Sequence, residues 1–162
     1  MTDMTAVALR DVTLRDGLQD ERPVDTDGKV ELFDRLLAAG VTDLELTSFV
    51  RPDRVPAMAD GEELARRTAG RDGITRWGLV LNDRGAARAL DCGLSHLQYV
   101  ISVSEQHQMR NAGGDVATSL LDLRRVVERA ARGGATVEVT LATAFGCPYA
   151  GPIARSEVVA LA

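Results

Sequence analysis

The sequence predicts an α/β fold of the (β/α)8 TIM-barrel type, with about five βα units present. Apolar runs typical of buried strands alternate with helical patterns, and short joins containing glycine lead from helices to strands. The longer loops follow the strands, which places them at the carboxyl edge of a parallel sheet, where such barrels carry their active sites. A complete barrel needs about 250 residues. The 162 residues are therefore expected to form a single domain, the N-terminal part of a barrel.

The predicted elements alternate along the chain. The first strand is expected at 6–13 and the first helix at 26–39, with Phe33 and Leu36 on its apolar face and Gly40 as its stop. The further predicted elements are strand 41–47, helix 62–68, strand 74–81, helix 83–91, strand 97–103, helix 116–132, strand 135–142 and a helix from 155. The inward side chains of helix 116–132 are predicted to be Leu120, Leu123, Val127 and Ala130.

Composition excludes several classes of function. The net charge of -5 argues against a nucleic-acid partner, which would favour a basic surface. No apolar run approaches the roughly 18 residues of a membrane span, and residues 1–5 lack the features of a signal peptide. Two cysteines do not make a disulfide framework, so a cytoplasmic protein is expected. Lys29, the only lysine, starts a helix predicted to lie on the surface, which argues against Schiff-base chemistry.

The stretch Arg15-Asp16-Gly17 follows the first predicted strand, where the chemistry of a parallel sheet is expected. Gly17 permits the turn that brings both charged neighbours to one pocket. A carboxylate suits a hard divalent cation, and a guanidinium suits an enolate oxygen or a carboxylate. For the dipeptide alone, an exposed surface ion pair is the more common interpretation.

Glu45 lies within an otherwise apolar strand and needs a partner if it is buried. Alternation places it on the same face as Asp43, Thr47 and Phe49. If that face is the barrel interior, Glu45 lies beside the pocket and either pairs with Arg15 or takes part in proton transfer. The alternative is a structural ion pair that orients Arg15.

Several motifs occur together in one order and spacing: 14–21, 44–50, 55–60, Asn82, 102–105, 110–111 and the Gly-Cys-Pro-Tyr-Ala-Gly stretch at 146–151. With them, the chain resembles the N-terminal part of the 3-hydroxy-3-methylglutaryl-CoA (HMG-CoA) lyase family of metal-dependent lyases and Claisen synthases. The resemblance covers nearly the whole chain. The Gly-Leu-Gln and Gly-Cys-Pro-Tyr forms favour the lyases over the synthases.

The resemblance implies roles for individual residues. Asp16 would be a ligand of a divalent cation, Mg or Mn, and Arg15 would contact the acyl-CoA substrate and stabilise its enolate oxygen. Gln19 would bind a substrate carboxylate or merely cap the turn. The residues implied as substrate or CoA contacts, with ordinary loop polarity as the alternative, are Asn82, Ser104 and Asn111.

Other polar residues receive a plainer interpretation. Cys147 is expected to be a packed or loop cysteine, because no histidine or lysine adjoins it in the sequence. The family's catalytic cysteine lies on a later loop, so Cys147 should not inherit that role. His107 follows a strand, but we expect it to be exposed to solvent rather than to be a ligand.

The implied reaction is retro-Claisen cleavage of HMG-CoA, or a similar 3-hydroxyacyl-CoA, to acetyl-CoA and acetoacetate. The family completes its metal site with two histidines and an asparagine from the second half of the barrel, which have no counterpart here. The chain is thus expected to be a fragment, a truncated product, or a half-barrel that closes by association, such as a homo-oligomer. Its end within a predicted helix favours truncation. The alternatives to a lyase are a non-catalytic assembly module and a condensing synthase.

Overall fold

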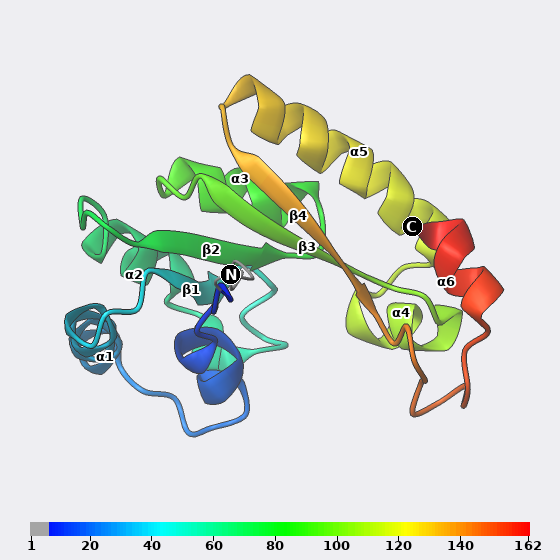
Figure 1. Cartoon of the computed structure of the whole chain (residues 1–162), viewed down its shortest axis with the longest axis horizontal. Helices are drawn as coiled ribbons and strands as arrows, with labels where there is room; N and C mark the ends of the chain where they lie inside the picture. The colour runs from blue at the N-terminus through cyan, green and yellow to red at the C-terminus, as the bar shows by residue number, and fades with distance from the viewer. Residues whose placement is uncertain (1–6) are drawn as a thin grey trace, which may run out of the picture.

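A computed structural model describes residues 7–162 and shows one parallel sheet with helices between its strands (Figure 1). The strands are β1 (Asp43–Ser48), β2 (Thr75–Val80), β3 (His96–Ser102) and β4 (Thr136–Ala142). They lie in the order β1-β2-β3-β4, and every neighbouring pair is parallel. This sequential order is that of a (β/α)8 barrel, here unclosed, and it confirms the predicted fold class.

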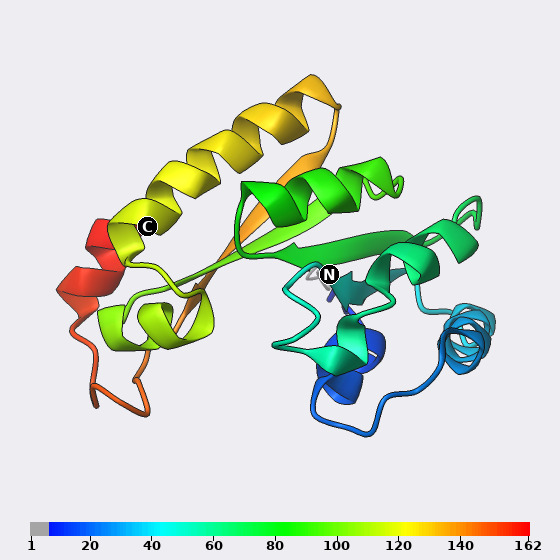
Figure 2. The same cartoon turned by 180° about the vertical axis from the view of Figure 1, so that it is seen from behind.

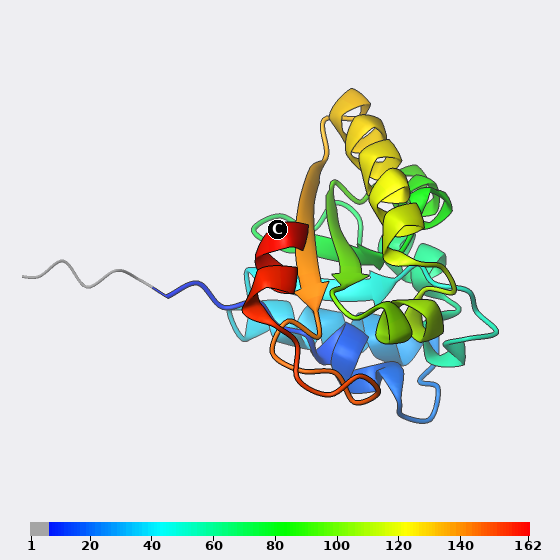
Figure 3. The same ribbon diagram turned by 90° about the vertical axis from the view of Figure 1, so that its right-hand side faces the viewer.

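The helices cover the sheet and connect its strands. They are α1 (Thr26–Ala38), α2 (Gly61–Arg67), α3 (Asp83–Asp91), α4 (Glu105–Asn111), α5 (Val116–Arg132) and α6 (Arg155–Leu161). Figure 2 shows α2, α3 and α5 side by side on one face of the sheet. Figure 3 shows α5 and α6 on opposite sides of β4. All the predicted helices are present, whereas α4 lies in a segment expected to be a loop. None of the described helices is long and apolar enough to cross a membrane.

Side-chain caps explain where several helices begin. Asp25 accepts a hydrogen bond from the backbone N–H of Gly28 (2.8 Å), and Asp115 accepts one from Thr118 (2.6 Å). Each carboxylate satisfies a backbone donor that has no partner within its own helix. These helix starts were therefore readable from the sequence.

The first predicted strand is largely wrong. Ala6 lies outside the described residues, and of the rest only Asp11 pairs with β1, through its N–H to Asp43 O (2.9 Å) and its C=O to Glu45 N (2.8 Å). The next residues form a π-helical turn, η1 (Thr13–Gly17). The apolar side chains of Val7 and Leu9 are 83% and 81% exposed. Among the described residues β1 alone flanks this segment, so a second neighbouring strand does not extend the pairing.

A register shift in β1 changes which side chains face the interior. Glu45 pairs with Trp77, but Thr47 pairs with Gly78, so one residue between them is extra. Beyond this bulge, Ser48 rather than Thr47 shares the face of Glu45. Thr47 faces α2 and the turn that precedes it, where its Oγ1 donates to Met58 Sδ (3.6 Å). The predicted alternation is therefore wrong for Thr47 and Phe49, because a single bulge reverses the faces after it.

Replacement of Gly61 by alanine should destabilise the fold, because α2 approaches β1 closely at this position. An added Cβ would lie 2.7 Å from Thr47 Oγ1 and 3.3 Å from the Ser48 carbonyl. We expect the free energy of unfolding to fall by about 1–3 kcal/mol, as measured by urea denaturation. Gly114→Ala is a matched control, since its nearest neighbour would be 3.9 Å away. Equal stability of the two variants would contradict the close packing.

Arg10 joins the two outer strands of the sheet. Its Nε donates to Asp43 of β1 (2.7 Å), and its Nη1 and Nη2 donate to Glu138 of β4 (2.8 and 3.0 Å). The guanidinium lies 3.9 Å from the centre of the Trp77 ring, so it spans the interior face. The hydrogen bonds to Glu138, with the hydrogen bond to Asp43, raise the pKa of Arg10. Arg10 thus links β1 and β4 through its side chain although the sheet is not closed.

The inward face of α5 agrees only in part with the predicted one. Ala130 is buried and Leu123 packs against the core, as predicted, whereas Leu120 and Val127 are 37% and 46% exposed and Val126 is buried instead. The buried Tyr99 hydroxyl donates to the Ser119 carbonyl (2.8 Å), which draws Ser119 toward the sheet. The predicted helical periodicity is correct, but the helix is rotated about its axis so that Ser119, Val126 and Ala130 face the sheet.

Asp83 should support the fold only above acidic pH. The hydrogen bonds from Arg129 of α5 (both 2.7 Å) lower the pKa of this α3 carboxyl below its ordinary value. A lowered folded pKa gives stability that is present above about pH 4 and lost as the pH falls through the folded pKa. We expect Asp83→Asn to reduce the free energy of unfolding by about 0.5–1 kcal/mol at pH 7. The difference should shrink toward pH 3.

Urea denaturation at pH 7 and pH 3 measures this effect. Asp72→Asn, on an exposed loop residue without an ion pair among the described residues, is the control and should change nothing. A difference for Asp83→Asn that is larger at pH 3 than at pH 7 would contradict the assignment.

Candidate functional site

Arg15 lies in η1 and is held by two carboxylates. Its Nε donates to Glu45 Oε2 (2.5 Å), a second guanidinium nitrogen pairs with the same oxygen, and Nη1 donates to Asp16 Oδ1 (2.6 Å). These contacts engage three of the five N–H donors of an arginine, so two remain for a ligand. The Arg15 side chain is 14% exposed. Arg15 is therefore a largely buried cation whose guanidinium is oriented by two carboxylates and has two N–H donors without a partner among the described residues.

The two carboxylates beside Arg15 have different environments. The Glu45 side chain is only 5% exposed, whereas that of Asp16 is 60% exposed. A buried carboxylate requires a partner of opposite charge, and Arg15 is that partner. The pairing expected from the sequence is thus present. Asp16 has room to bind a further group, and Glu45 does not.

The other predicted contact residues follow the ends of strands or turns, but they do not all have free side chains. Asn82 caps α3, where its Oδ1 accepts from Gly85 N (2.9 Å), and Ser104 caps α4, where its Oγ accepts from His107 N (3.3 Å). Gln19 is half-buried just after η1, and Asn111 is exposed at the end of α4. Asn82 and Ser104 therefore act as helix caps in this structure, and their roles in substrate binding stay predictions.

The described residues do not by themselves form a metal site. The exposed carboxylate of Asp16 suits Mg or Mn, which prefer oxygen ligands. Within residues 7–162, however, no three side chains of His, Cys, Asp or Glu form a group that could hold a metal ion. An octahedral Mg²⁺ needs about six oxygens in all. These residues by themselves therefore do not fit a complete metal site.

A second polar cluster, at the carboxyl ends of β3 and β4, was missed by the sequence reasoning. His107 Nδ1 lies 2.7 Å from Ser102 Oγ, and the His107 ring lies beside Tyr149, with centroids 6.1 Å apart. The Arg110 guanidinium lies 4.2 Å from the centre of the same tyrosine ring. The available signal was the spacing of His107 and Arg110, which are one turn apart on a helix.

Cys147 is buried next to this cluster, as expected for a packed cysteine. Its Sγ accepts hydrogen bonds from the backbone N–H groups of Tyr149 and Ala150 (both 3.4 Å). Burial raises the pKa of the thiol, but the Ser104 hydroxyl, these N–H groups and the Arg110 charge together lower it below its ordinary value. The thiol environment is thus more favourable to negative charge than the sequence indicated.

The HMGL-like family model matches residues 6–162, nearly the whole chain. The chain belongs to the HMGL-like family. Its relatives include the (R)-citramalyl-CoA lyase of Chloroflexus aurantiacus, which is 39% identical over 98% of this chain and 54% of that protein. A hydroxymethylglutaryl-CoA lyase of Bacillus subtilis is 33% identical over 96% of this chain and 52% of that protein. The resemblance drawn from the motifs is confirmed.

Solved structures of HMG-CoA lyases share the fold. One from Acinetobacter baumannii, in complex with coenzyme A and 3-methylmalate, has a TM-score of 0.89 and 35% identity. It covers 94% of this chain, which in turn covers 50% of that chain. One from Brucella melitensis has a TM-score of 0.86 and 31% identity, and the corresponding shares are 93% and 55%. The chain therefore spans about half the length of the HMGL-like relatives it matches.

Lys29 is buried in this HMGL-like chain, so its predicted surface position was wrong. The residue is 2% exposed, its Nζ donates to the Ala57 carbonyl (2.6 Å), and it forms an ion pair with Asp60. Lys29 lies four residues before Phe33 and thus on the same face of α1. That spacing was the signal for its burial. The contacts fasten α1 to the loop that follows β1.

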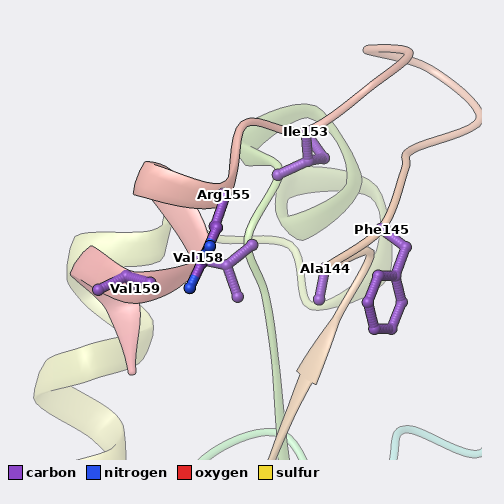
Figure 4. A pocket seen from close by; sticks show the side chains of 6 residues that line it. All are labelled: Ala144, Phe145, Ile153, Arg155, Val158 and Val159. Carbon is purple, nitrogen blue, oxygen red and sulfur yellow. The ribbon is translucent and has the colours of Figure 1, made fainter.

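An apolar groove lies apart from Arg15. It has a volume of about 460 Å³ and lies between α6 and the loop after β4 (Figure 4). Ile153 and Val158 lie on the α6 side, and Ala144 and Phe145 lie on the loop side. The Phe145 side chain is fully exposed. This apolar groove, beside the outer edge of β4, carries none of the predicted site residues.

Proposed function

We propose that the chain supplies the first half of the active site of an acyl-CoA lyase. The substrate would be HMG-CoA or a similar 3-hydroxyacyl-CoA, and the products acetyl-CoA and a keto acid, acetoacetate for HMG-CoA. The observation that carries the proposal is Arg15, a largely buried cation held by Glu45 and Asp16, with two N–H donors that have no partner within residues 7–162. Relatives named as lyases of such thioesters support the same assignment.

The proposed reaction breaks one carbon–carbon bond. A base accepts the proton of the 3-hydroxyl group and leaves an alkoxide, whose electrons form the ketone as the bond between C2 and C3 breaks. The electron pair of that bond moves to the thioester and gives the enolate of acetyl-CoA, which is then protonated at C2. Arg15 would donate its free N–H groups to the enolate oxygen, where negative charge develops. Glu45 would hold the guanidinium in that direction, and a role in proton transfer is the alternative.

We propose Asp16 as one oxygen ligand of a divalent cation, Mg or Mn. Its exposed carboxylate supports this, and further ligands would have to come from outside residues 7–162. Such a cation supplies a Lewis acid that polarises substrate oxygens. The chain's own contribution would be to orient the substrate beside Arg15. Substrate contacts by Gln19, Asn82, Ser104 and Asn111 belong to the same proposal.

The direct test is an activity assay of a protein in which the second half of the barrel is supplied by a relative. A chimera that joins residues 1–162 to the second half of the Chloroflexus aurantiacus relative, here called the completed barrel, is incubated with HMG-CoA or citramalyl-CoA and Mn²⁺. We expect acetyl-CoA and the keto acid in equal amounts. A completed barrel that is folded by circular dichroism but releases no acetyl-CoA from either thioester would overturn the proposed function.

A non-catalytic assembly module is the second candidate, supported by the apolar groove beside β4 and by Val139 of β4, which is 41% exposed. Exposed apolar surface at a sheet edge favours association. This alternative predicts a homo-oligomer without turnover. Light scattering of the 162-residue chain measures its oligomeric state, and the acetyl-CoA assay of the completed barrel measures turnover. Together the two measurements separate the two candidates.

A further inference from the structure

We propose that His107, Arg110 and Tyr149 form a binding site for an oxyanion, a carboxylate or a phosphate, at the mouth of the sheet. His107 and Arg110 lie on α4, which follows β3, and Tyr149 lies in the loop after β4. Their positions are therefore on the edge where η1 also places Arg15. That the oxyanion belongs to an acyl-CoA rests on the function proposed above.

The His107 ring is held in a fixed direction. Its Nδ1 lies 2.7 Å from Ser102 Oγ, on the last residue of β3, and the ring is half-buried. In the imidazolium, and in the neutral tautomer whose Nδ1 accepts from Ser102, Nε2 carries a proton and can donate; in the other neutral tautomer Nε2 accepts. His107 thus has one ring nitrogen in contact with the protein and the other available to a ligand.

Arg110 is a cation without a carboxylate partner in the described part of the chain. The Arg10, Arg15, Arg88 and Arg129 guanidinium groups each contact an acidic side chain, whereas that of Arg110 lies 4.2 Å from the Tyr149 ring centre. The face of the tyrosine ring contacts the Arg110 guanidinium and holds it in place, and this contact does not use the N–H donors of the guanidinium. Tyr149 is 47% exposed, so the cluster is accessible from solvent.

The contacts of Cys147 add support from the loop after β4. Two backbone N–H groups and the Arg110 charge surround its sulfur, and together with Ser104 they lower the pKa of the thiol. Negative charge is therefore stabilised within the cluster, next to the neighbouring rings of His107 and Tyr149. Arginine and histidine donors at such a place are the typical partners of carboxylate and phosphate groups. An acyl-CoA of the proposed class carries both kinds of group.

Calorimetric titration of the protein with separate probes tests the site and its ligand. The probes are CoA, dephospho-CoA, 3-hydroxy-3-methylglutarate and inorganic phosphate. We expect Arg110→Ala to weaken binding of the recognised probe by about tenfold or more, the loss typical of a charge-assisted hydrogen bond. His107→Phe should weaken it about threefold to tenfold. Loss confined to 3-hydroxy-3-methylglutarate identifies a carboxylate site, and loss confined to CoA and dephospho-CoA identifies a phosphate site.

Two controls keep the experiment decisive. Arg124→Ala removes an equal charge from the exposed surface of α5 and should leave all affinities unchanged. His107→Asn retains a side chain that can hydrogen-bond Ser102, so it guards against misfolding. The inference is overturned if no probe binds, or if Arg110→Ala and Arg124→Ala bind the probes equally. If Arg110 governs anion binding but the completed barrel has no lyase activity, the site stands and the proposed function fails.

Discussion

Replacement of Arg15 by methionine should lower the rate of acetyl-CoA release by the completed barrel about 10²- to 10³-fold. The reason is the loss of the donors that the enolate oxygen would meet, since one such donor contributes a factor of this size. Arg15 is the one cation paired with the buried Glu45, so no other described side chain replaces it there. Arg15→Lys should recover only part of the rate. A planar guanidinium can donate to Glu45 and to the substrate from different nitrogens, whereas lysine has a single ammonium nitrogen.

Stability must be separated from chemistry in this experiment. Arg15→Met leaves the Glu45 carboxylate buried and unpaired, which costs about 3–5 kcal/mol of unfolding free energy. The double variant Arg15→Met/Glu45→Gln removes that charge and should regain stability without regaining activity. Arg51→Met is the matched control, because Arg51 pairs only with the exposed Asp53 in the loop after β1. If Arg15→Met were folded and as active as Arg51→Met, Arg15 would have no role in catalysis.

Replacement of Glu45 by glutamine should lower kcat about 10- to 100-fold, because small displacements of a catalytic group have effects of this order. Glutamine keeps the volume but offers Arg15 one neutral oxygen in place of a carboxylate. If Glu45 only positions Arg15, the pH profile of kcat keeps its shape while its height falls. If Glu45 transfers a proton, one limb of the profile disappears.

The pH profile of kcat, measured on wild-type and Glu45→Gln completed barrels, decides between these roles. Asp43→Asn serves as a control for a second carboxylate on the same face of β1, paired with Arg10 rather than Arg15. An unchanged kcat in Glu45→Gln would show that neither role is correct.

Much of the fold was predictable because local signals and tertiary structure agree. Helix α3 begins and ends where predicted, since Asn82 caps it and the apolar pattern is regular. Helix α4 was missed because its sequence is polar almost throughout, and only Gln108 of its residues is buried. The bulge in β1 has no local signature, yet it decides that Ser48 rather than Thr47 shares the face of Glu45.

The candidate site was predictable to the same extent. The contact of Arg15 with Glu45 followed from a buried charge that requires a partner, a rule that operates without knowledge of the fold. The use of Asn82 and Ser104 as helix caps did not follow, because a polar residue after a strand suits a cap and a substrate contact equally. The cluster of His107, Tyr149 and Arg110 joins segments separated by β4, and only the tertiary structure brings them together.

The most direct test of the central claim, that Arg15 stabilises an enolate at this edge of the sheet, is exchange of the acetyl-CoA methyl protons with D₂O. Exchange requires enolate formation but no carbon–carbon bond cleavage, so it isolates the step assigned to Arg15. The completed barrel should catalyse the exchange, the Arg51→Met control should retain it, and Arg15→Met should lose it about 10²-fold or more. Exchange at the wild-type rate in a folded Arg15→Met protein would contradict the account.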